Sequence, residues 1–107
     1  MSASFVASRA ELSGLAAGIA REVDLSPTSV VVAPLPRYWG RCHGDGTIEL
    51  SDSLIGQTKE FARQVIVHEL LHLVVPNHGP LFKSLFLAYT GSLTVGHGES
   101  QCSSAPD

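Results

Sequence analysis

Positive charge is scarce in this sequence. Seven Lys and Arg residues stand against ten Asp and Glu residues, which gives a net charge of -3 over 107 residues. Strong binding to nucleic acid or to an anionic membrane relies on clustered Lys and Arg, so neither partner is expected. Charged residues make up only 16%, against about 25% in typical soluble domains, and 44% are hydrophobic. This balance predicts a folded core and excludes disorder of the whole chain.

Long apolar runs and cysteine are also scarce. The most apolar segment, residues 65–75, is about half the roughly 20 residues that cross a bilayer, and it contains two His and one Glu. No basic segment precedes an apolar one near the first residue, as a secretion signal requires. The two cysteines, Cys42 and Cys102, are therefore expected to be reduced thiols. Together these absences predict a cytoplasmic protein without a membrane span.

The first half of the sequence predicts one helix followed by three short strands. Ser8 and Glu11 have the spacing of a capping box, which marks the start of a helix, and this helix is expected to end before Pro27. Three β-branched or alternating segments then follow, bounded by Pro and Gly. They predict a small, mostly antiparallel sheet with strands at 30–32, 38–39 and 47–50.

Helical spacing returns in the second half. Thr58 is placed as the N-cap of a buried helix that runs through Val75 and ends at Pro76, because proline lacks an amide donor and clashes with the preceding turn. A last helix is expected to begin at Pro80 and to end near Gly91.

These elements fit one domain. At about 100–200 residues per domain, residues 1–90 are predicted to form a single α+β domain of order α-β-β-β-α-α, in which the sheet packs on the second helix. The segment 91–107 is small and polar and is expected to be a flexible tail.

The second helix carries the motif His68-Glu69-Leu70-Leu71-His72. Residues four apart on a helix differ by about 40° in angle and one turn in height, so the two imidazoles can face one point. Catalytic zinc binds imidazole nitrogens and usually takes three protein ligands, which leaves one position for water. Glu69 lies beside this point and is predicted to be the general base that accepts a proton from the zinc-bound water.

The third ligand is predicted to be His78. In an unbroken helix His78 would be turned about 240° from His72 and raised by about 9 Å, away from the site. Pro76 breaks the helix, so the chain can fold back and bring His78 to the metal. One Zn2+ per chain, held by His68, His72 and His78, also removes the cost of burying these polar groups among aliphatic side chains.

Several motifs together resemble the YgjP-like metallopeptidase domain, which belongs with the SprT-like zincins. The resemblance covers about residues 35–89 and rests on Trp39-Gly40-Arg41-Cys42, Ile48-Glu49-Leu50, Val65 to Leu73, Pro76-Asn77-His78 and Phe82. It implies a minimal, gluzincin-like peptidase core with His68, His72 and His78 as zinc ligands and Glu69 as the catalytic carboxylate. Two residues depart from the family pattern: Ser51, where Asn is common, and Lys83, where an aromatic residue is common.

The predicted function is hydrolysis of peptide bonds, with Glu69 activating a zinc-bound water. An exposed edge of the sheet is expected to bind an extended peptide or an unfolded protein by strand addition. Two alternatives stay open. The first is a zinc-dependent hydrolase of a non-peptide substrate such as a nucleotide, although no Gly-rich phosphate loop is present. The second is a latent or inactive zinc-binding module. A replacement of Glu69 would favour this alternative, but Glu69 is present.

The roles of several other residues are also left open. The donor that stabilises the developing oxyanion is sought among Arg37, Tyr38, Arg41, His43 and Tyr89. A tail residue that folds back to occupy the open zinc position would keep the enzyme latent, and the candidates are His97, Glu99 and Cys102. Cys42 and Trp39 are expected to pack in the core. Solvated positions on helix faces are expected for Lys59, Glu60, Arg63 and Lys83.

Overall fold

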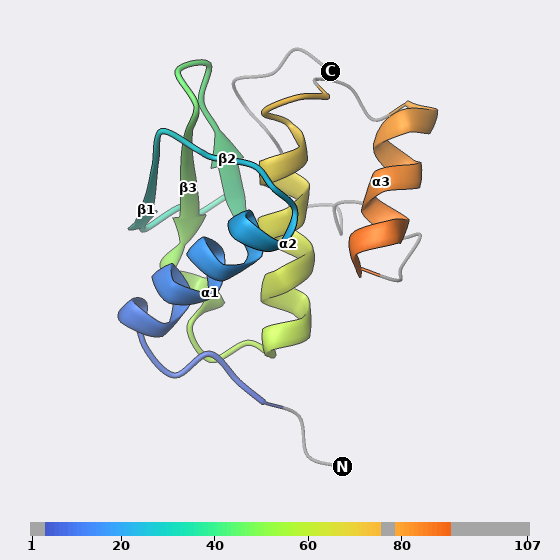
Figure 1. The fold of residues 1–107 in the computed structure, drawn as a ribbon. Coiled ribbons are helices and arrows are strands. Elements are labelled where there is room, and N and C mark those ends of the chain that lie inside the picture. The colour runs from blue at the N-terminus through green and yellow to red at the C-terminus, as the bar shows by residue number, and fades with distance from the viewer. Residues whose placement is uncertain (1–3, 76–78, 91–107) are drawn as a thin grey trace.

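The computed structural model describes residues 4–75 and 79–90. Over these residues the chain forms three α-helices, three strands and one short 3-10 helix, in the predicted order α-β-β-β-α-α (Figure 1). The segment 76–78, which contains His78, and the tail expected over 91–107 lie outside the described residues. No helix in the described ranges is long and apolar enough to cross a membrane.

The helices and strands lie close to their predicted positions. Their bounds are α1 Arg9–Glu22, β1 Ser29–Ala33, β2 Gly40–Cys42, β3 Thr47–Ser51, α2 Lys59–Leu71 and α3 Pro80–Thr90, with the 3-10 helix η1 at Asp52–Leu54. Both predicted N-caps are confirmed, because the Ser8 and Thr58 hydroxyls accept hydrogen bonds from the backbone N–H three residues later. The strand predicted at 38–39 is wrong by two residues. Its partner β3 turns into η1 after Ser51, so no strand remains for residue 38 to pair with.

The sheet is mixed and has the order β1-β3-β2, so the prediction of a mostly antiparallel sheet is wrong. β2 and β3 form a hairpin, in which Arg41 lies opposite Glu49. β1 runs parallel to β3 on its other side, with Val32 opposite Leu50. The connection from β1 to β2 therefore crosses β3, and β2 is left at one edge of the sheet. Alternation of apolar residues along a strand is the same in either direction, so it does not reveal this order.

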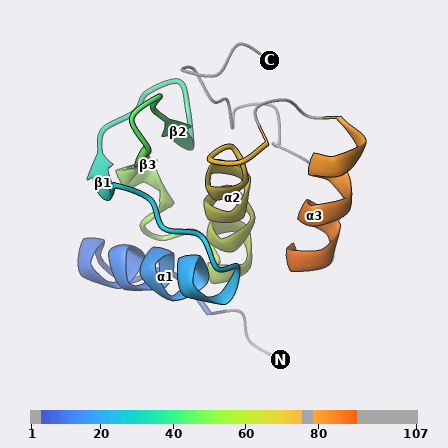
Figure 2. The same cartoon turned by 45° about the horizontal axis from the view of Figure 1, so that its top comes forward.

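Helix α2 is the centre of the molecule. Figures 1 and 2 show the sheet and α1 to one side of α2, with α3 to the other. α2 packs against α1, α3, β2 and β3, and its buried residues therefore extend around most of its circumference, as predicted. The largest fully buried apolar side chains come from α1, β3, η1, α2, α3 and the segment before α1: Val6, Leu12, Ile48, Leu50, Leu54, Ile66, Leu70, Leu71, Phe82 and Phe86.

Arg63 joins the three helices. It was predicted to be solvated, but its side chain is only 29% exposed. Its guanidinium donates two hydrogen bonds to the carboxylate of Glu22 at the end of α1, at 3.1 and 2.5 Å. It donates two more to the carbonyl oxygen of Tyr89 in the last turn of α3, at 3.2 and 3.0 Å. The last carbonyls of a helix have no partner within the helix and carry partial negative charge. Arg63 therefore fixes α3 against α2 and α1.

Candidate metal centre

Three polar side chains are buried at the end of α2, two in its last turn and one at its C-cap. His68, Glu69 and His72 are 1%, 0% and 7% exposed, respectively. Burying such groups is unfavourable unless each gains hydrogen bonds or a metal. The helix was predicted to continue through Val75, but it ends at Leu71, with His72 as its C-cap. The chain tightens there into bonds between residues three apart, as is common at helix ends and ahead of a proline.

The two histidines face each other although the helix ends between them. His72 keeps right-handed helical dihedrals, φ -67° and ψ -13°, so the spacing of one turn from His68 is preserved. The Nε2 atoms of the two rings lie 3.3 Å apart. Two nitrogens that each lie about 2.05 Å from a tetrahedral zinc are separated by about 3.3 Å. The contact is within hydrogen-bond distance, and two imidazole nitrogens at this spacing could also accommodate a zinc ion.

A backbone carbonyl sets the protonation of His72. Its Nδ1 lies 3.1 Å from the carbonyl oxygen of Val75. Because a carbonyl only accepts hydrogen bonds, Nδ1 carries the proton, and in the neutral ring Nε2 then presents its lone pair. Hydrogen bonds of this kind orient metal-ligating histidines in many proteins. The turn that ends α2 thus aims Nε2 of His72 toward His68.

Helix α3 forms an aromatic wall over the two histidines. The Phe82 ring centroid lies 5.3 Å from that of His68 and 4.9 Å from that of His72. Phe86 lies 6.4 Å from His68, and both phenylalanines are fully buried. An apolar shell limits water access and strengthens electrostatic interactions within a site.

Glu69 lies against the strand β2. A Cβ atom built on Gly40 of β2 would come within 2.9 Å of the Glu69 Cγ, so the Glu69 side chain is in direct contact with the backbone of β2. Glu69, the predicted base, follows His68 in the sequence and lies next to the edge strand β2 in space. This arrangement brings a buried carboxylate, two imidazoles and a strand edge into one region.

The third predicted ligand, His78, lies outside the described residues. Among residues 4–75 and 79–90, no group of three or more His, Cys, Asp or Glu side chains could hold a metal. The structure therefore brings together two of the three predicted ligands, and it buries the predicted base Glu69 on the same helix.

Comparison with known proteins identifies the family. The model of the YgjP-like metallopeptidase domain matches residues 6–94 of the chain. The chain belongs to the YgjP-like metallopeptidase family. No curated protein and no solved structure matches it significantly. The match begins well before residue 35, so α1 is part of the YgjP-like domain as well. Membership of this family indicates a metal-dependent peptidase.

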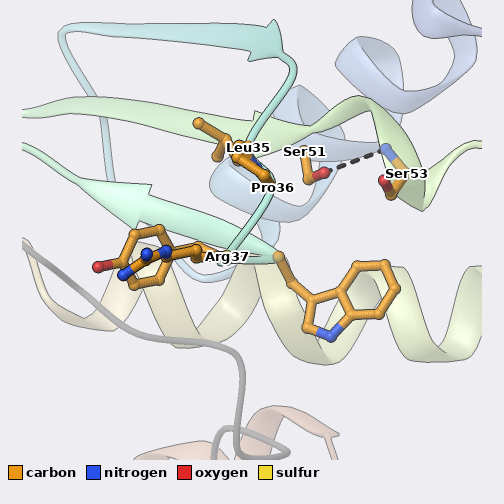
Figure 3. A pocket seen from close by; sticks show the side chains of 7 residues that line it. Leu35, Pro36, Arg37, Ser51 and Ser53 are labelled. Carbon is orange, nitrogen blue, oxygen red and sulfur yellow. Dashed lines mark hydrogen bonds between the residues drawn. The ribbon is translucent and has the colours of Figure 1, made fainter.

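A pocket of about 120 Å3 lies beside the start of β2 in the YgjP-like domain (Figure 3). At its rim the Ser53 N–H donates a 3.1 Å hydrogen bond to the Ser51 hydroxyl, drawn as a dashed line. Trp39, another lining residue, packs edge-on against Phe61 with ring centroids 5.0 Å apart. None of the lining residues belongs to α2, and they are Leu35, Pro36, Arg37, Tyr38, Trp39, Ser51 and Ser53.

The candidates for the oxyanion donor occupy three different places. Arg37 and Tyr38 line the pocket beside β2. Arg41 and His43 both approach the carboxylate of Glu49, at 3.8 and 2.6 Å. Tyr89 lies on α3, where its backbone carbonyl accepts from Arg63. All five residues stay candidates for this role.

Two features of the site were not predicted. The phenylalanines of α3 have the spacing of an ordinary apolar helix face, and only the fold shows that they cover the histidines. Gly40 was part of a recognised motif, but its contact with Glu69 depends on how closely β2 approaches α2. A glycine directly after the strand predicted at 38–39 is the one signal that could have indicated such an approach.

Proposed function

We propose that the chain is a zinc-dependent peptidase in which His68, His72 and His78 hold the metal and Glu69 is the general base. The observation that supports this most directly is the pair of buried Nε2 atoms 3.3 Å apart, next to a buried carboxylate. Nitrogen donors at this spacing suit zinc better than magnesium or calcium, which prefer oxygen ligands. Membership of a metallopeptidase family supports the same reaction class.

The residues of the site have separate tasks in this mechanism. When bound, zinc supplies a Lewis acid that polarises a carbonyl and lowers the pKa of water. Glu69 accepts the proton of the attacking water and delivers it to the departing amine. The carbonyl of Val75 keeps Nδ1 of His72 protonated, so that the ring binds the metal through Nε2. Phe82 and Phe86 exclude water from the back of the site.

The substrate that fits best is an extended peptide segment. β2 is an outer strand of the sheet and packs on α2, so a peptide that adds to this edge would run beside Glu69. The pocket beside Trp39 adjoins the start of β2 and could receive one substrate side chain. Strand addition requires an extended backbone, which favours unfolded proteins and flexible segments over folded ones.

Cys42 is a buried thiol, which fits a reducing compartment such as the cytoplasm.

Hydrolysis of an unfolded casein-like protein by wild type and Glu69→Gln tests this proposal. Glutamine keeps the size of the side chain but cannot accept the proton, so we expect at least about a 100-fold loss of activity with one zinc per chain in both proteins. Equal activity in the two proteins would contradict the role of Glu69. Zinc without hydrolysis of any peptide by the wild type would favour a non-peptide substrate or a latent module.

A further inference from the structure

Strand β2 approaches α2 so closely that no side chain fits at Gly40 unless a neighbour moves. A Cβ built there would lie 2.9 Å from Cγ of Glu69, 3.3 Å from Cγ1 of Val65 and 3.3 Å from the carbonyl oxygen of Glu49. Separations below 3.0 Å between a Cβ and another heavy atom are essentially never tolerated. The residue has no positive φ, unlike Gly46 and Gly56. Glycine is therefore required at this position by space and not by backbone conformation.

The three neighbours differ in how easily they can move. The Glu49 carbonyl belongs to the backbone of the central strand, and Val65 is a β-branched side chain that is 1% exposed. Neither can shift without moving the sheet or the core. The nearest atom, Cγ of Glu69, moves by rotation about a single side-chain bond. A methyl group at residue 40 would therefore be accommodated mainly by turning the Glu69 carboxylate away from its position.

We propose that Gly40 is a positioning residue for Glu69. The bare backbone of β2 forms the surface against which the Cγ of Glu69 rests, and this contact fixes the direction of the carboxylate. The strand that is placed to hold the substrate then also aligns the base, so that both are set by one element. The inference rests on the proposed function for what the carboxylate does, while the contact itself is independent of it.

The kinetic test compares Gly40→Ala with Gly44→Ala at saturating zinc. Gly44 lies in the same hairpin, has no positive φ and has no heavy atom within 4 Å of its built Cβ, so it is a matched control. A misplacement of about 1 Å in a reacting group lowers rates by about 100-fold. We expect kcat of Gly40→Ala to fall by about 10- to 100-fold, with KM and zinc affinity within about 2-fold of wild type, and Gly44→Ala to match wild type. Wild-type kcat in Gly40→Ala would overturn the proposal.

A stability cycle separates positioning of Glu69 from simple packing of β2 on α2. We would measure Tm of the zinc-loaded full chain for Gly40→Ala alone, with Glu69→Ala and with Val65→Ala. Alanine at residue 69 has no Cγ, so the added methyl group should lower Tm much less in that background than in wild type. If Gly40→Ala alone does not fold, recovery of folding in the double variant with Glu69→Ala is the same result.

Each outcome of the cycle decides the proposal. Coupling to Glu69→Ala that exceeds coupling to Val65→Ala supports it. Coupling to Val65→Ala alone, or no rescue by Glu69→Ala, shows that Gly40 only allows β2 to pack, and overturns it. If the wild type hydrolyses no peptide, the proposed function fails, and the cycle still tests the contact between Gly40 and Glu69.

Discussion

The two halves of α2 use polar residues in opposite ways. In the first half, Arg63 donates to a carboxylate of α1 and to a carbonyl of α3, so its charge is matched by acceptors from the chain itself. In the second half, His68 and His72 turn two nitrogens toward one point inside an aromatic and aliphatic shell. The first arrangement holds helices together, whereas the second has the spacing that suits a metal. One helix can thus serve both as the main structural element and as the carrier of the site.

Removing a histidine should affect metal binding far more than any change in the first half of the helix. We expect His72→Ala to weaken zinc binding by at least about 100-fold, since loss of an outer-shell partner alone costs about 10- to 100-fold. Zinc titration against a competing chelator measures this effect. His43→Ala is the matched control, because His43 lies against Glu49 on the sheet, and its zinc affinity should stay at the wild-type level. Unchanged affinity in His72→Ala would remove the proposed site.

The aromatic wall of Phe82 and Phe86 links the two halves of α2. Both residues lie on α3, and Arg63 in the first half of α2 fixes α3 in place. Phe82 is fully buried between α3 and the histidines, and Phe82→Ala is expected to lower the free energy of unfolding by about 3–5 kcal/mol. Denaturant unfolding measures the change. The neighbouring Leu81 is 61% exposed, so Leu81→Ala should change the same quantity by less than about 0.5 kcal/mol. Equal effects of the two variants would show that Phe82 is not part of the core.

The smallest expected effect is a pH dependence in the first half. Hydrogen bonds from Arg63, and then its charge, lower the pKa of Glu22 below the usual 4.5. Glu22 therefore stabilises the fold above pH 4.5, and this contribution is lost as pH falls through the lowered pKa. The Tm difference between wild type and Glu22→Gln should thus be constant from pH 7 to about pH 5 and vanish at more acidic pH. In an Arg63→Ala background the same substitution should give no such pH-dependent difference; a persistent one would contradict the pairing.

Features set by residues close in sequence were predicted well. The capping serine and threonine, the three helices and the approach of His68 to His72 all depend on contacts within one turn. The order of the strands depends on how the segment after β1 crosses β3, and nothing in the residues of the strands records that path. The reach of Arg63 to Glu22 and Tyr89 likewise depends on neighbours far away in the sequence.

The same division holds inside the site. The proximity of His68 and His72, the proposed metal ligands, follows from their i, i+4 spacing, whereas the contacts around them come from other segments. The Val75 carbonyl orients His72, and the Phe82 ring packs against both imidazoles. The backbone at Gly40 lies against the Glu69 side chain. Each of these contacts requires the packed domain, so a motif identifies the reacting groups but not the residues that position them.

X-ray absorption spectroscopy of the zinc-loaded wild type tests the central claim most directly. The account predicts one zinc per chain with nitrogen or oxygen neighbours at about 2.0–2.1 Å and outer-shell scattering from three imidazole rings. The imidazole signal should weaken in His68→Asn, His72→Asn and His78→Asn alike. A sulfur neighbour at about 2.3 Å would assign the metal to a cysteine, and a protein that binds no zinc would contradict the claim.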